Sequence, residues 1–412
     1  MTENKKLKIV LAYSGGLDTS TIVPWLKENY DCEVHAVCVN VGQGDNEEEV
    51  VSRGLRIGAT TVEYVNVQDE FVKDYVYPML KSGAMYEGKY LLGTSIARPL
   101  IAKVLVEKAK ALGADAICHG ATGKGNDQVR FELTIMALAP EMKIIAPWRI
   151  WDIKSRQDAL DYCAARGIDL PMSADTSYSR DENMWHLSHE GLELEDPANA
   201  PNYEKLLQNT TPLEKTPDEG EFVEIEFVKG IPVKVNGKEM APAEMIFYLN
   251  EIGGKHGVGV IDMVENRVVG MKSRGVYETP AGTILYFAHN ELEELCLDRE
   301  MSALKREISL KYANMVYEGK WFSRTREALD AFVDATQETV TGTVKMKLYK
   351  GHIINYGKTS PYSLYNQEIS SFETGELYDH KDSEGFIKLY GLPLKINAMM
   401  KANNACKCEC DK

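Results

Sequence analysis

The sequence has 412 residues, of which 44% are hydrophobic and 26% are charged, an ordinary composition for a globular protein of about two domains. Its net charge of −15 argues against nucleic-acid binding, because nucleic acids are bound through a basic face. No run approaches the roughly 20 apolar residues of a membrane span, and the polar start at residues 1–6 lacks the apolar core of a secretion signal, so we expect a cytoplasmic protein.

Residues 14–20, with the sequence SGGLDTS, follow an apolar strand at 7–13 and open a helix predicted over 19–27. Paired glycines let backbone N–H groups turn toward an anion, and the helix N-terminus adds partial positive charge. The loop is too short for a Walker A box and lacks the glycine spacing of a dinucleotide fingerprint. It indicates a cradle for pyrophosphate, in an enzyme that cleaves ATP between the α and β phosphates. The alternative is a left-handed turn in which Asp18 or Thr19 caps the helix.

The rest of the first half alternates predicted strands and helices. Nearly continuous apolar runs indicate parallel strands buried on both faces, and apolar residues at helical spacing that stop at glycine indicate helices. Repeated βα units predict a doubly wound parallel sheet whose ligands bind at the carboxyl ends of the strands. The expected strands are 34–41, 61–67, 116–118 and 143–147, and the expected helices start near Asp45, follow the third strand to about Leu80, and cover 96–112 and 154–166.

The pattern changes after about Leu170. Strict alternation of apolar and polar residues, with turn pairs such as Asn236-Gly237, predicts antiparallel hairpins. The second half is therefore predicted to be α+β. Its segments are a connector at 199–220, strands at 222–228, 231–235 and 344–349, and a long helix or bent helix pair at 283–319.

Three further strings, at residues 90–99, 119–130 and 264–280, are polar and punctuated by glycine. The second follows a strand, as the SGGLDTS loop does, so both should lie at one edge of the sheet. On spacing alone, ligand binding is the preferred interpretation of the second string, and an ordinary structural role is preferred for the other two. The structural alternatives are Thr94 and Ser95 as helix caps with Arg98 solvated, Asn126 or Asp127 as a helix cap, and Arg267, Lys272 and Arg274 as a charged loop.

The chain has eight cysteines. Three stand close together in the tail as Cys406, Cys408 and Cys410, where they could bind a soft metal, but no second ligand set with zinc spacing accompanies them. An unstructured tail is the preferred interpretation. The other five have apolar neighbours and are predicted to be core thiols: Cys32, Cys38, Cys118, Cys163 and Cys296.

The strings YLLGTS-ARP, HGATGKGNDQVRFE, APWR, DEN and VENR-GMKSRG-YETPAGTIL together resemble the argininosuccinate synthase family, from residue 9 to about 394. SGGLDTS alone is shared with other N-type ATP pyrophosphatases, the PP-loop superfamily. The resemblance implies three regions. These are an ATP-binding PP-loop domain at 1–170, similar to adenine nucleotide α hydrolases, a synthetase domain for substrate binding and multimerisation at 171–383, and an oligomerisation arm with the cysteine-rich tail at 384–412.

The resemblance also implies an activity. It is that of an AMP-forming carbon–nitrogen ligase of arginine biosynthesis, in which citrulline, aspartate and ATP give argininosuccinate, AMP and pyrophosphate through a citrullyl-adenylate. Mg²⁺ should accompany ATP, because the leaving pyrophosphate needs charge neutralisation. The partners would be small molecules, with no nucleic acid and no membrane, and the family pattern implies a homotetramer with exchanged C-terminal segments.

By position match, the resemblance assigns site residues. Glu265 suits an α-ammonium group and Arg130 suits a carboxylate. The resemblance implies catalytic roles for three residues. Asp127 would face the aspartate amine, Asn126 would lie between the two substrates, and Asp18 would lie near the metal or cap its helix. No general base and no metal ligand is assigned. The ATP residues are Ala12, Tyr13, Ser14, Gly15, Gly16, Leu17, Asp18, Thr19, Ser20, Val39, His119, Gly120 and Lys124; the citrulline residues are Tyr90, Ser95, Asn126, Arg130, Ser179, Ser188, Glu265 and Tyr277; the aspartate residues are Thr122, Asn126 and Asp127.

Two other functions compete with the ligase. A tRNA-modifying sulfurtransferase would use the same ATP loop, but it needs a reactive cysteine pair and a basic RNA-binding face. A non-catalytic nucleotide-binding relative would carry broken substrate positions, whereas every matched position here is chemically intact.

Overall fold

The structure, a computed structural model, describes residues 6–168, 178–371, 377 and 379–410. The chain divides into two compact units, Met1–Tyr362 and Ser363–Lys412. All of the site residues predicted from the sequence belong to the first unit, which contains the parallel sheet and both antiparallel sheets.

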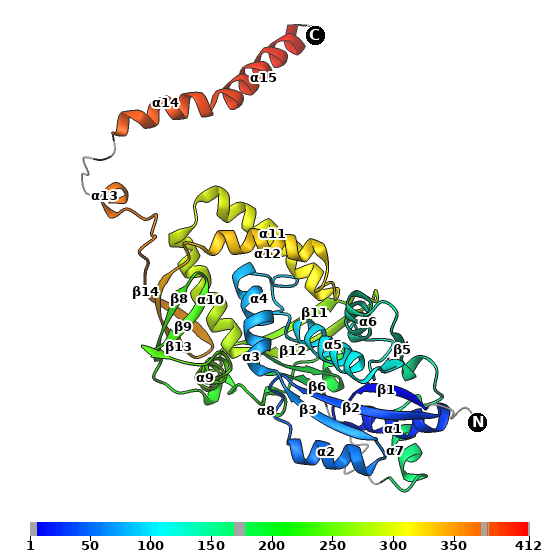
Figure 1. Ribbon diagram of the computed structural model, residues 1–412. Helices are drawn as coiled ribbons and strands as arrows, with labels where there is room; N and C mark the ends of the chain where they lie inside the picture. Colours follow the sequence, from blue (N-terminus) through cyan, green and yellow to red (C-terminus); the bar gives the residue numbers. More distant parts are fainter. Residues whose placement is uncertain (1–5, 169–177, 372–376, 378, 411–412) are drawn as a thin grey trace. The chain divides into compact units, whose positions relative to one another are not determined.

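The first half is built on a five-stranded parallel sheet in the order β3-β2-β1-β4-β5 (Figure 1). The strands are β1 Leu7–Ala12, β2 Cys32–Asn40, β3 Thr61–Asn66, β4 Ala116–Cys118 and β5 Lys143–Ile145. The helices around them are α1 Leu17–Asn29, α2 Glu47–Arg56, α3 Gln68–Phe71, α4 Tyr77–Ser82, α5 Gly93–Leu112, α6 Asp127–Leu138 and α7 Arg156–Ala164, with a π-helical turn, Val72–Val76, between α3 and α4.

Alternate residues of β1 point to opposite faces of this sheet. Val10 packs in a cluster with apolar residues of α5, whereas Ile9 and Leu11 pack in a separate cluster with α1 and α7. Helices therefore cover both faces, and the doubly wound fold predicted from the sequence is confirmed. The strand order reverses between β1 and β4, so the segments that follow these two strands meet at one edge of the sheet.

The second half is α+β with two antiparallel sheets, as predicted. One has the order β11-β12-β7-β6 and the other the order β10-β9-β8-β13-β14. The first consists of β6 Ser179–Glu182, β7 Leu187–Glu190, β11 Val260–Asn266 and β12 Lys272–Glu278. The second consists of β8 Glu221–Val228, β9 Ile231–Val235, β10 Lys238–Glu239, β13 Gly342–Tyr349 and β14 His352–Thr359.

The preference for a charged loop at 264–280 is wrong, because most of that string lies in the β11–β12 hairpin. Its charged residues are neutralised by neighbours, which lets the strands form. The Arg274 guanidinium donates across the hairpin to both carboxylate oxygens of Asp262, at 2.9 and 2.7 Å. The other side of the hairpin buries Glu265 and Tyr277, which face the site described below.

The helical segment expected at 283–319 is a pair of helices, α10 Pro280–Cys296 and α11 Arg299–Tyr317. They are separated at Asp298, whose carboxylate accepts the N–H of Met301 at 2.8 Å and so caps α11. The connector at 199–220 contains the short helix α8 Tyr203–Leu206. The remaining large helices of this half are α9 Pro242–Lys255 and α12 Arg324–Gln337.

The turn at residues 183–186, between β6 and β7, joins the two halves. Met184 donates its N–H to the carbonyl of Val41 at 3.0 Å, and the Trp185 indole donates to the carbonyl of Leu91 at 2.9 Å. Gly42 lies so close that a Cβ there would stand 2.5 Å from the Cβ of Met184. The halves therefore share one hydrophobic core, and the antiparallel sheet of β6, β7, β11 and β12 is held against the parallel-sheet half.

The described residues of the second unit include α13 Gln367–Ser370, α14 His380–Tyr390 and α15 Leu392–Cys410. The preference for an unstructured tail is wrong, since α15 continues through Cys410, and its Leu, Met, Ala and Lys residues are strong helix formers. The side chains of Cys406, Cys408 and Cys410 lie outside the described residues, so the metal-binding alternative stays open. Throughout the parts of the chain that the structure describes, no helix has both the length and the apolarity needed to cross a membrane.

Candidate active site

The loop between β1 and α1 has the form of an anion cradle. Gly15 has φ +74°, a left-handed conformation that favours glycine, and its carbonyl accepts a hydrogen bond from the Arg53 guanidinium at 2.6 Å. Gly16 is the N-cap of α1 and no side chain caps that end, so neither Asp18 nor Thr19 has the capping role considered above. The first N–H groups of α1 have no partners within the helix, which leaves them available to a phosphate.

The segment after β4 borders this cradle. A Cβ on Gly120 would lie 3.3 Å from Cγ2 of Thr19 and 3.1 Å from Cδ1 of Ile22, so its backbone packs against the first turns of α1. His119 is fully buried, with Nε2 3.1 Å from Glu132 and Nδ1 accepting the N–H of Ala121 at 3.3 Å. These two contacts of His119 fix the position of the segment after β4.

The same segment leads into a polar cavity of about 220 Å³ between α5, α6 and the sheet of β6, β7, β11 and β12. Nine residues that the sequence assigned to citrulline or aspartate line it: Tyr90, Thr122, Asn126, Asp127, Arg130, Ser179, Ser188, Glu265 and Tyr277. Six further residues line it that were not assigned: Thr94, Gly125, Arg180, Asp181, Glu190 and Arg267. The structure thus brings together residues that are far apart in sequence.

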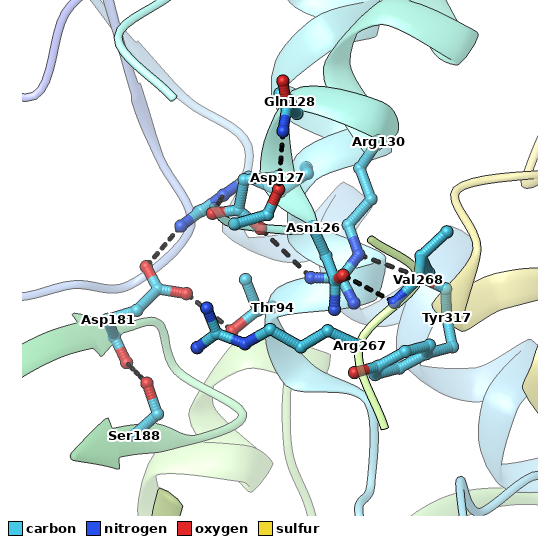
Figure 2. A network of polar contacts seen from close by, with 12 residues as sticks. Thr94, Asn126, Asp127, Gln128, Arg130, Asp181, Ser188, Arg267, Val268 and Tyr317 are labelled. Carbon is cyan, nitrogen blue, oxygen red and sulfur yellow. Dashed lines mark hydrogen bonds and ion pairs between the residues drawn. The ribbon is translucent and has the colours of Figure 1, made fainter. Parts of the chain in front are cut away.

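Asp127 stands at the centre of an ionic network in this cavity (Figure 2). One of its oxygens accepts from Nε of Arg98 at 2.8 Å and the other from Nη1 of Arg130 at 3.0 Å. Arg98 also reaches Asp181 at 2.6 Å, and Thr94 donates to the second oxygen of Asp181 at 2.6 Å. The expectation that Arg98 is solvated is wrong: its side chain is 16% exposed because two carboxylates neutralise it.

The structure also contradicts the interpretation of Thr94 and Asn126 as helix caps. Thr94 bonds to Asp181 instead of capping α5, whose N-cap is Leu92 with no side-chain cap bond. Asn126 occupies the N-cap position of α6, but its side chain makes no cap bond there; its oxygen accepts the N–H of Val268 at 2.9 Å instead. Burial has the largest single effect on the pKa of Asp181 and raises it, but Arg98, His186 and Thr94 together outweigh burial and hold that pKa well below its usual range.

Arg130 keeps one donor without a partner. Its Nε donates to the carbonyl of Tyr317 at 3.1 Å and Nη1 to Asp127, whereas the buried Nη2 has no hydrogen-bond partner among the described residues. Arg130 is 4% exposed and lines the cavity. A buried donor that lacks an acceptor is costly, so this guanidinium edge is prepared for an oxygen of a ligand.

Glu265 is the matching buried anion. Tyr277 donates to one of its carboxylate oxygens and Tyr317 to the other. Burial raises the pKa of Tyr277, and it raises the pKa of Tyr90 to about 12, so both phenols keep their protons at neutral pH. The cavity therefore offers a carboxylate and a guanidinium to one ligand, as the head group of an amino acid requires.

Arg267, just after β11, also pairs with Glu190: its Nη2 donates to both carboxylate oxygens, at 2.8 and 2.7 Å. Burial raises the pKa of Glu190, and the charge of Arg267 opposes this rise. Arg267 also donates to the carbonyl of Lys124 at 3.2 Å, which ties the β11–β12 turn to the segment after β4.

Other assigned residues lie outside the cavity. Ser95 is fully buried, and its hydroxyl has no hydrogen-bond partner among the described residues. Val39 is buried near the carboxyl end of β2, and the Lys124 side chain is exposed. Burial raises the pKa of the Asp18 carboxyl, opposed by the charge of Arg156. No group of three or more His, Cys, Asp or Glu side chains gathers as a metal site in the described part of the chain.

Two family models match most of the chain. The arginosuccinate synthase N-terminal HUP domain matches residues 8–169, and the arginosuccinate synthase C-terminal domain matches residues 178–397.

Curated proteins named argininosuccinate synthase match nearly the whole chain. That of Brachyspira hyodysenteriae is 64% identical over 396 residues, which cover 96% of this chain and 98% of its own. That of Lachnoclostridium phytofermentans is 63% identical over 400 residues, covering 96% and 98%. That of Acetivibrio thermocellus is 60% identical over 401 residues, covering 97% and 99%.

Proposed function

The chain belongs to the argininosuccinate synthase family, and from this premise we propose that its polar cavity binds citrulline and aspartate while residues 14–20 bind ATP. The protein is an ATP-dependent ligase that joins citrulline to aspartate and releases AMP and pyrophosphate through a citrullyl-adenylate. The segment after β4 supports the proposal, because Gly120 packs on the phosphate loop while Asn126 and Asp127 line the cavity.

The observation that carries the citrulline assignment is the buried Nη2 of Arg130, for which the described residues supply no hydrogen-bond partner. A citrulline carboxylate accepting from Nη2 would satisfy this donor, while Glu265 would receive the α-ammonium group. Ser179 and Ser188, on adjacent strands β6 and β7, line the same space. With its head group held at this end, citrulline would direct its ureido group toward the phosphate loop.

We propose that Asp127 receives the amine of aspartate. In the structure this carboxylate is shared by Arg98 and Arg130, so the substrates would exchange ionic partners with it as they bind. A neutral urea is a poor electrophile, and transfer of AMP to its oxygen provides a leaving group. The chain's contribution is to hold the three reactants in line and to stabilise charge on the phosphates through the N–H groups of the loop and of α1.

Mg²⁺ would accompany ATP and neutralise the charge of the leaving pyrophosphate. Asp18 fits such an ion, because Mg²⁺ is commonly held by one or two carboxylates together with substrate phosphates and water. It lies in the first turn of α1 and makes no cap bond. We therefore propose Asp18 as the protein ligand nearest the metal, directly or through water.

The test is a product assay with ATP, citrulline and aspartate in which each is omitted in turn. AMP and pyrophosphate should appear only when all three are present. ADP and phosphate, or no turnover by the folded protein, would contradict the assignment of the loop or of the substrates.

A sulfurtransferase function is not favoured. Cys118, next to the segment after β4, is fully buried, and burial raises the pKa of its thiol well above the usual value, which makes it unreactive.

We further propose a homotetramer in a reducing, cytoplasmic compartment. Large apolar side chains of α14, including Phe386, Leu389 and Tyr390, are exposed in the single chain, as expected of a helix that packs on another subunit. Among the described residues, five buried cysteines are unpaired, which suits a reducing compartment. Light scattering at several concentrations would test the tetramer.

A further inference from the structure

Tyr317 lies at the last position of α11 and contacts both charged residues proposed to bind the head group of citrulline. It is 187 positions from Arg130 in the sequence and 52 from Glu265. No feature of the sequence marked it as part of the site, and it does not line the cavity. Tyr317 nevertheless contacts Arg130 through its backbone carbonyl and its ring, and Glu265 through its hydroxyl.

The backbone and ring hold Arg130. The Tyr317 carbonyl, at the negative end of α11, accepts from Nε of Arg130 at 3.1 Å, and the Arg130 guanidinium carbon lies 5.0 Å from the centre of the Tyr317 ring. The chain then turns at Gly319, where φ is +78° and a Cβ would lie 2.8 Å from Cα of Arg130. These contacts fix the guanidinium and leave Nη2, which has no acceptor in the described part of the chain, for a ligand.

The hydroxyl holds Glu265. It donates to one carboxylate oxygen while Tyr277 donates to the other. Glu265 is 5% exposed, so water contributes little to its solvation, and two phenol donors replace it. Both oxygens retain lone pairs for a further donor, such as an ammonium group.

The Tyr317 ring is also held by Tyr86. Tyr86 stacks on Tyr317 with ring centres 3.6 Å apart and planes inclined by 5°, and the Tyr86 hydroxyl donates to the carbonyl of Asn266, next to Glu265. Tyr317 therefore has little freedom to move. Because the Arg130 guanidinium and the Glu265 carboxylate both contact this one rigid residue, the distance between them is fixed.

We propose that Tyr317 is a positioning residue that sets the distance between Glu265 and Arg130 and thereby makes the cavity selective for the α-amino acid head group. An α-amino acid carries its ammonium and carboxylate on one carbon, so a site with fixed spacing rejects ligands that lack either group. This inference rests on the proposed binding of citrulline in the cavity and extends it to a residue that does not touch the substrate.

The test compares L-citrulline with 5-ureidopentanoate, which is the same molecule without the α-ammonium group. Binding of each to the purified full-length protein is measured by calorimetry, and the ratio of the two dissociation constants reports recognition of the ammonium. In Tyr317→Phe the ring and carbonyl stay and only the hydroxyl is lost. We expect this ratio to fall about tenfold, the loss typical of one hydrogen bond to a charged group, and the Michaelis constant for citrulline to rise with little change in kcat.

Tyr312→Phe is the matched control. Tyr312 lies on the same helix, is fully buried and donates to the carboxylate of Asp330 at 2.6 Å, outside the cavity. It should lower stability without changing the ratio. A ratio unchanged in Tyr317→Phe, or lowered equally in Tyr312→Phe, would overturn the proposal.

A second pair of variants covers the case in which Tyr317→Phe does not fold. Tyr86→Leu removes the ring that stacks on Tyr317 and should lower the ratio, whereas Tyr86→Phe keeps the ring and should preserve it; equal ratios in these two variants would overturn the proposal. Failure of the wild-type protein to bind citrulline at all would instead contradict the proposed function of the cavity. This outcome is measured on the wild-type protein alone and so does not depend on any variant.

Discussion

The proposed phosphate loop and the proposed amino-acid cavity would recognise charge in different ways. The loop at residues 14–20 relies on backbone N–H groups at the start of α1, and its shape depends on glycines such as Gly15. The cavity relies on charged side chains from distant segments, which in this structure bind one another: Asp127 with Arg98 and Arg130, and Glu190 with Arg267. On the proposed assignments, the loop would receive a phosphate without rearrangement, whereas the cavity would exchange internal ion pairs for substrate contacts.

The largest effect is expected from a change in the loop. Gly15→Val places a β-branched residue at φ +74° and so forces the loop out of shape. Pyrophosphate release should fall by about 10²- to 10³-fold, as when a preorganised donor to a reacting phosphate is removed. Gly44→Val is the control, because Gly44, in the loop after β2, has φ +72° and a Cβ added there would meet no atom within 4 Å. Equal activity losses in the two variants would mean that Gly15 has no special role.

A change at the centre of the cavity should affect one substrate. Asp127→Ala removes the proposed partner of the aspartate amine and leaves Arg98 and Arg130 without their shared anion. The kcat/KM for aspartate should fall by about 10²-fold, the usual cost of breaking a buried charge pair, with much less change in ATP binding. Steady-state kinetics with Asp262→Ala as control would check this, since Asp262 pairs with Arg274 outside the cavity. Normal aspartate kinetics would contradict the assignment.

A smaller effect is expected when the shape of one cation is changed. Arg98 contacts Asp127 through Nε and Asp181 through Nη2, and a lysine cannot hold two carboxylates in this geometry. Arg98→Lys should lower kcat/KM for aspartate by about tenfold, as for one charge-assisted hydrogen bond, and leave the Michaelis constant for citrulline nearly unchanged. If both substrates were affected equally, the cavity would be a single coupled network.

The smallest effect is expected from a buried histidine that belongs to neither the loop nor the cavity. His289 is buried, donates to Gln337 at 2.8 Å and lies near Glu293, Lys305 and Lys81. Burial lowers the pKa of His289, so the unfolded chain takes up a proton more readily than the folded one. Its contribution to stability is complete above the unfolded pKa of about 6.5 and is lost as the pH falls through the folded pKa. Between pH 7.5 and 5.5, the melting temperature of the wild type should fall more than that of His289→Gln; equal falls would contradict this explanation.

The structural features that depend on residues close together in the sequence could be predicted from it. The buried runs of β1 and β2 and the glycines of the loop signal their structure locally, and the family resemblance assigned nine of the residues that line the cavity. The contacts of Arg98 could not be predicted, because Asp181 is 83 positions away and the spacing of the first string equally suits a solvated arginine. The β11–β12 hairpin was missed because its charges are neutralised by partners that only the fold brings near, such as Asp262 for Arg274. Tyr317 was missed because its partners, Arg130 and Glu265, are 187 and 52 positions away in the sequence.

The close contact between Gly42 and Met184 has a consequence for protein engineering. Recombination between relatives would most naturally exchange segments at the gap between the two matched regions, 8–169 and 178–397. Gly42 and Met184 then come from different parents, although the turn that carries Met184 fits against β2 only if position 42 has no side chain. A chimera that brings any larger residue to position 42 should therefore lose the registration of its halves, even when both parents are fully active.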